Sequence, residues 1–127
     1  MPGEVSRETL EFIRSCFTSV WALELLLLMR RECTKIWSIG DLIQELRASD
    51  LIVREALPEL VNCGLIAETG REMFQYRPVE SALEQLVNRV AAAYGQNRLL
   101  VVQEILNARA ANIRMFADAF KLKKDDK

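Results

Sequence analysis

Residues 37–78 read WSIGDLIQELRASDLIVREALPELVNCGLIAETGREMFQYRP, and this stretch decides the fold. Up to Gly64 its apolar residues recur every three or four positions, which is typical of helices that bury one face. After Gly64 apolar and polar residues alternate, as in a strand with one buried face. Ser38 and Ser49 stand where side chains that cap helix N-termini are expected. The pattern predicts helices over 38–47 and 50–63 and then a hairpin over 65–77.

Glycine and proline residues indicate where the helices and strands of this stretch end, turn or bend. Gly64 follows the second helix at the position where a left-handed backbone commonly ends a helix. Gly70 is expected to take the permissive position of the hairpin turn, and Pro78 closes the second strand. Pro58 lies inside the second helix and removes one backbone donor there, so we expect a kink or a loosened turn.

Helical patterns flank the stretch on both sides. Upstream, SVWALELLLLMRR at 19–31 is the most apolar helix of the chain, and a shorter helix is expected over 5–17. Downstream, the helical spacing returns over 80–94, with Gly95 as its expected stop, and again over 97–120.

The order of these elements resembles winged helix-turn-helix bacterial regulators of the MarR and ArsR type. That order is helix, short strand, helix, short turn, helix, glycine and hairpin. The resemblance covers residues 19–78 and is carried by Val53, Ala56-Leu57, Leu60 and Gly64-Leu65-Ile66. It implies binding of double-stranded DNA, with the helix over 50–63 in the major groove and the hairpin over 65–77 as a wing on the backbone.

The predicted fold is mainly α with a small β-hairpin, arranged as a winged helix-turn-helix with additional C-terminal helices. We expect Trp21 and Trp37 to pack in its core, with each indole N–H finding a partner. The expected divisions are an N-terminal helical arm at 1–18, the winged core at 19–78, C-terminal helices at 79–120 and a polar tail at 121–127.

Two functions are compatible with this pattern. If the chain is a DNA-binding regulator, the contacts are expected from Arg47, Ser49, Arg54, Arg71 and Arg77. Residues 36–78 nevertheless contain four arginines against seven carboxylates, whereas a DNA-binding surface is normally basic. The alternative is a winged-helix module that docks on a macromolecular machine through a protein contact, for which Leu51 and Ile52 at the start of the helix are suited.

The C-terminal helices predict a homodimer. Four consecutive apolar residues, 99–102, point around more than half of a helix, so one side faces the core and the other needs a different cover. In the alternative, these helices fold back on 19–31 and cover Leu27 within one chain. The expected interface residues are Leu99, Leu100, Val101, Val102, Ile113, Phe116 and Phe120.

The amino-acid composition excludes several kinds of catalytic and metal site. The 127 residues carry a net charge of −1 and include no histidine, which excludes His-based catalysis and His-containing metal sites. The three cysteines form no CxxC motif and are expected to be free and mostly buried thiols. We expect no catalytic residues, no metal and no cofactor. The charged N-terminus and the absence of a long apolar run favour a cytoplasmic protein that does not enter a membrane.

Overall fold

The computed structural model describes residues 5–109. The described part is mainly helical with a small antiparallel sheet, as the sequence predicts. Residues 98–109 are also helical. The elements in chain order are α1 (Arg7–Cys16), α2 (Val20–Arg31), β1 (Ile36–Ser38), α3 (Ile39–Leu46), α4 (Asp50–Asn62), β2 (Ile66–Gly70), β3 (Met73–Tyr76) and α5 (Ser81–Gln96).

The sheet has three strands in the order β1-β3-β2, so the predicted hairpin gains β1 as a third strand. Trp37 of β1 lies opposite Phe74 of β3, and both side chains are buried. Ser38 and Ser49 cap α3 and α4 by accepting hydrogen bonds from the backbone amides of Asp41 and Ile52. Strand, helix, turn, helix and hairpin therefore follow one another as in a winged helix-turn-helix.

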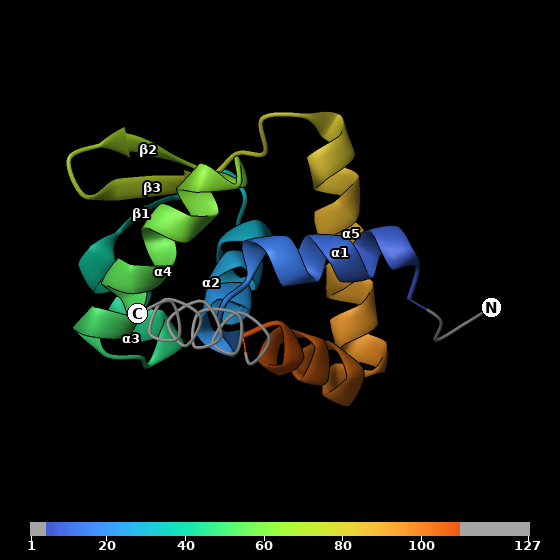
Figure 1. Cartoon of the computed structure of the whole chain (residues 1–127). Coiled ribbons are helices and arrows are strands. Elements are labelled where there is room, and N and C mark those ends of the chain that lie inside the picture. The colour runs from blue at the N-terminus through green and yellow to red at the C-terminus, as the bar shows by residue number, and fades with distance from the viewer. Residues whose placement is uncertain (1–4, 110–127) are drawn as a thin grey trace, which may run out of the picture.

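Helix α2 lies at the centre of the molecule. Figure 1 shows α3, α4 and the sheet on one side of it, and α5 with residues 98–109 on the other. Its side chains Leu23, Leu25 and Leu26 are fully buried, because both groups of elements cover it. Among the described residues no single helix is long and apolar enough to cross a membrane; only α1 and α2 together reach that length, and the chain bends by 105° between them.

The two tryptophans differ in burial. Trp37 is fully buried as expected, with the Lys35 ammonium 3.8 Å from its ring centroid, but its indole N–H has no hydrogen-bond partner within the described residues. The expectation that Trp21 is a core residue is wrong, since it is 40% exposed. It stands in the first turn of α2 and lines an open cavity together with Ile52 of α4.

The turn residues confirm one expectation and correct another. Gly64 has φ +76° and ends α4 in the left-handed region, as predicted. Gly70 does not supply the left-handed residue of the hairpin turn. It belongs to β2, where the pairing with β3 shifts after Glu68, and Glu72 takes φ +57° instead. The irregular pairing moves the tight turn to Arg71 and Glu72.

One helix boundary also differs from expectation. Helix α5 passes through Gly95 to Gln96, and the break falls at Asn97, whose side chain accepts a hydrogen bond from the amide of Leu100. Asn97 therefore caps the next helix, which is a stronger stop than a glycine at an exposed helical position. Helix α4 continues through Pro58 to Asn62, close to its expected end, because its buried face holds both halves against the core.

The C-terminal helices pack on their own chain. Val87, Val90, Val101 and Ile105 are fully buried. The Arg14 guanidinium lies 2.8 Å from the Glu104 carboxylate and ties α1 to the helical residues 98–109.

The fully buried Val101 corrects its expected place in a dimer interface. Leu99 remains exposed, whereas Leu100 and Val102 are half-buried. Ile113, Phe116 and Phe120 lie outside the described residues.

Candidate functional site

The turn between α3 and α4 positions the first of the expected DNA contacts. Arg47 ends α3 with a left-handed backbone, φ +58°, and its side chain is exposed. The Ser49 hydroxyl is the N-cap of α4 and accepts from the Ile52 amide at 3.2 Å. Of these two residues, Arg47 is free to reach outward, whereas Ser49 has a structural role that fully explains its place.

Arg54 is the outward basic residue of α4, and two carboxylates hold it. Its Nε lies 2.9 Å from Asp50 one turn earlier, and its Nη1 lies 2.7 Å from Glu72 in the hairpin turn. Hydrogen bonds to Glu72 and then to Asp50 raise the pKa of Arg54. Such exposed pairs contribute little to stability. They do place two negative charges around Arg54, one of the four arginines that were expected to contact DNA.

An apolar-floored groove lies between α3, α4 and the wing, with a volume of about 360 Å³. Ile39, Ile43 and Met73 supply apolar side chains, and the Arg54 ion pairs form one edge. Arg71 also lines it, is exposed, and makes no ion pair among residues 5–109. The fold thus brings Arg54 and Arg71 together as expected, in an environment that contains carboxylates and apolar side chains.

The start of α4 carries an apolar surface. Leu51 is 66% exposed, and Ile52 lines a second cavity of about 290 Å³ together with Trp21. Glu55, Glu59 and Arg109 supply charged groups to its lining, and the Glu59 carboxylate accepts hydrogen bonds from Thr18. The sequence pattern identified Leu51 and Ile52 but missed Trp21, because helical spacing placed it with the buried leucines of α2.

Arg77 does not join the other expected DNA contacts. It follows β3 at the open end of the hairpin, where its amide donates to the Leu65 carbonyl, whereas Arg71 lies at the closed end. Arg77 instead lines a separate open cavity with Arg30, Arg31 and Tyr76. Both Arg71 and Arg77 were expected to contact DNA because both belong to the predicted hairpin.

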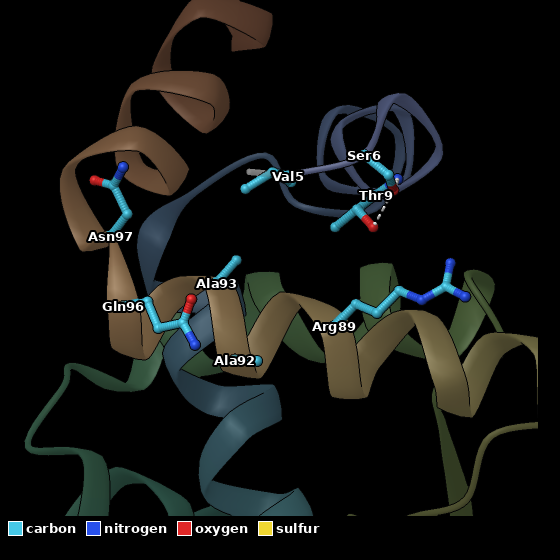
Figure 2. A pocket seen from close by; sticks show the side chains of 8 residues that line it. All are labelled: Val5, Ser6, Thr9, Arg89, Ala92, Ala93, Gln96 and Asn97. Atoms are coloured by element: carbon cyan, nitrogen blue, oxygen red, sulfur yellow. Dashed lines mark hydrogen bonds between the residues drawn. The ribbon is translucent and has the colours of Figure 1, made fainter. Parts of the chain in front are cut away.

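A further cavity of about 410 Å³ lies between α1 and α5 (Figure 2). Several of its polar groups already have partners. Arg89 donates to Glu8 at 2.8 Å, and the hydroxyls of Ser6 and Thr9 lie 2.8 Å apart. Ala92 and Ala93 form the opposing wall, and Gln96 and Asn97 complete the polar lining.

Reactive groups are scarce among the described residues. Burial, followed by proximity to Cys63, raises the pKa of the Cys16 thiol to about 12, so Cys16 is protonated at neutral pH and is a poor nucleophile. Cys33 is exposed and Cys63 is half-buried, so the cysteines are free but less buried than expected. Residues 5–109 hold no group of three carboxylate or thiol side chains placed to bind a metal ion.

Comparison with protein-family models, with curated proteins and with solved structures finds no match for this chain.

Proposed function

We propose that this protein is a winged-helix interaction module that binds another protein through the outer face of α4. The observation that carries the proposal is the contrast between two neighbouring residues. Arg54, the expected DNA reader, is bonded to Asp50 and Glu72, while Leu51 projects into solvent with 66% of its surface exposed. A surface that shields its cation and exposes a large apolar side chain suits a protein partner better than a phosphate backbone.

Charge indicates the chemistry of the partner. Residues 36–78 have four arginines against seven carboxylates, and Glu55 and Glu59 flank the cavity shared by Ile52 and Trp21. Complementary potentials favour association. The partner therefore presents an apolar side chain to Leu51 and Trp21, with basic residues around it that face the carboxylates of α4.

Site-specific photo-cross-linking in cells tests this surface. A photo-cross-linking amino acid in place of Leu51 is expected to yield one discrete protein adduct. The same amino acid in place of Gln85, which is exposed on α5, is the matched control and is expected to yield none. Glu55→Lys and Glu59→Lys in the Leu51 variant are expected to abolish the adduct, because they reverse the charges that attract a basic partner.

Specific cross-linking results would contradict the proposed surface. Adducts of equal strength from positions 51 and 85, or an adduct at 51 that both charge reversals leave unchanged, would reject the α4 face as the binding surface. An adduct with nucleic acid instead of protein would transfer the assignment to DNA.

DNA binding is the second candidate function, supported by the winged topology and by Arg47 and Arg71, which are exposed on either side of α4. It requires retardation of duplex DNA that weakens steeply with salt. The double variant Asp50→Asn/Glu72→Gln releases Arg54 and removes two negative charges. It would strengthen that binding, and Arg71→Ala would reduce the salt slope by about 1.

Self-association is part of the proposal. Leu99 and Leu106 are exposed, seven residues apart on one face of the helix, with Val102 half-buried between them. A second copy that covers this face would remove all three from water. We therefore propose a homodimer built on this face.

Sedimentation equilibrium at micromolar concentration is expected to give twice the chain mass of 14.5 kDa. Leu99→Glu and Leu106→Glu are expected to shift the protein to the monomer, since each buries a carboxylate in the interface. Gln103→Glu, an exposed change on the same helix, serves as the control and leaves the mass unchanged. A wild-type protein that sediments at 14.5 kDa throughout the range contradicts the dimer.

A further inference from the structure

An open cavity lies where the end of α2, the end of β3 and the first half of α5 meet, away from the α4 surface. It has a volume of about 640 Å³, which lies within the usual range for small-molecule sites. Its polar lining comes from Arg30 and Arg31 of α2, Tyr76 and Arg77 at the end of the hairpin, and Glu84 and Asn88 of α5.

The three arginines of this cavity have no carboxylate partner within salt-bridge distance among residues 5–109. Arg30 donates through Nε and Nη2 to the Asn88 side-chain oxygen, at 3.1 and 2.9 Å, and Arg77 donates to the Gln75 side chain at 3.2 Å. Glu84 is the one carboxylate in the lining. Four arginines elsewhere in the fold are paired with carboxylates, namely Arg14, Arg54, Arg89 and Arg98, whereas the exposed Arg47 and Arg71 make no ion pair among residues 5–109.

Tyr76 adds a second, independent observation. The side chain lines the cavity and is 7% exposed, yet its hydroxyl has no hydrogen-bond partner within the described part of the chain. A buried hydroxyl without a partner is rare in folded proteins and calls for an explanation such as an absent ligand. Burial raises the pKa of Tyr76, and nearby Arg30 opposes that shift, so the hydroxyl is a neutral donor at physiological pH.

We propose that this cavity binds the phosphate group of a small molecule, held by the guanidinium groups of Arg31 and Arg77 and by the hydroxyl of Tyr76. A phosphate dianion needs more than one cation and accepts several hydrogen bonds at once, and arginine forks match its geometry. The Arg30–Asn88 contact joins α2 to α5 at the wall of the cavity, whereas the three groups that hold the phosphate lie on α2 and at the end of β3. This site is independent of the α4 surface and of the partner proposed for it.

Calorimetric titration with inorganic phosphate, in chloride buffer of matched ionic strength, tests the site. The wild-type protein is expected to bind phosphate saturably with one site per chain. Arg31→Gln and Arg77→Gln are each expected to weaken binding about tenfold or more, because each removes a charge-assisted hydrogen bond. Tyr76→Phe is expected to weaken binding while leaving the thermal midpoint of the free protein unchanged or higher, since it removes a hydroxyl that has no partner.

Arg71→Gln is the matched control, because it removes the same charge from an exposed arginine at the other end of the hairpin. Its phosphate affinity is expected to equal that of the wild type. No saturable binding by the wild-type protein, or equal losses in Arg71→Gln and Arg77→Gln, would overturn the site.

A nucleoside monophosphate and a short DNA duplex distinguish the sources of the phosphate group. Competition by the monophosphate for the same site supports a small-molecule ligand. Binding of the duplex through Arg31 and Arg77 without uptake of inorganic phosphate rejects it. Arg31 and Arg77 are both exposed, so Arg31→Gln and Arg77→Gln are expected to fold. These two variants therefore test the phosphate site even if Tyr76→Phe does not fold.

Discussion

Trp37→Ala is expected to lower the free energy of unfolding by about 3–5 kcal/mol. Trp37 is fully buried at the centre of the edge strand β1, opposite Phe74, and its truncation leaves a cavity that β1 and α3 cannot close. The unpartnered indole N–H places the loss toward the lower end of this range, since its removal ends an unsatisfied burial. Equilibrium unfolding in urea, followed by circular dichroism, measures the change.

Trp21→Ala is the control with the same change of side chain. Because Trp21 is 40% exposed at the edge of a cavity, its loss is expected to be only about 1–1.5 kcal/mol. If the two variants lose equal stability, the packing described for α2 is wrong. Trp21→Ala is also expected to weaken the protein contact that we propose for α4, whereas an exposed change outside that surface is not.

Gly64→Ala is expected to destabilise the protein by about 2–4 kcal/mol, from backbone strain and a steric clash. Gly64 has φ +76°, a conformation that a residue with a Cβ adopts at a cost. A Cβ at this position would also lie 2.8 Å from Cγ2 of Val79. The Val79 amide donates to the Gly64 carbonyl at 2.9 Å, so the two segments cannot easily move apart.

The double variant Gly64→Ala/Val79→Ala separates the two contributions. Val79 is 72% exposed, so Val79→Ala alone is expected to change stability little. In the double variant the clash is relieved, and a loss of about 1–2 kcal/mol from the left-handed backbone remains. Equal losses in the single and double variants would show that the backbone conformation alone accounts for the effect. The urea midpoints of the wild type, the two single variants and the double variant measure these changes in stability.

Local pattern was sufficient for most of the fold. The serine caps at 38 and 49, the change of period at Gly64 and the apolar spacing of α2 each reflect interactions within a few residues. Such signals survive in a single sequence, because caps and left-handed helix ends have few chemical solutions. The predictions for Gly70 and Gly95 were wrong because a neighbouring residue could take the same role. The strand pairing places the left-handed turn residue at Glu72, and α5 ends at Asn97.

The candidate site was predicted less completely than the fold. The sequence pattern identified Leu51 and Ile52 as outward residues of α4. Of these two residues, the structure exposes Leu51 more. It did not place Trp21 beside them, since helical spacing alone assigns a face but does not tell what covers it. It also did not separate Arg77 from Arg71, because the two ends of a hairpin are near in sequence and far apart in contacts.

The sequence by itself determined the helices, the hairpin, their order and the excess of carboxylates over arginines in the winged core, because these depend on neighbours along the chain and on composition. Only the tertiary structure decided which charges meet. Arg54 acquires Glu72 from the wing, Arg30 acquires Asn88 from α5, and the Tyr76 hydroxyl beside Arg77 is left without a partner among residues 5–109. Coulombic attraction and hydrogen bonding fall off within a few ångströms, so such pairings exist only once segments distant in sequence have packed together.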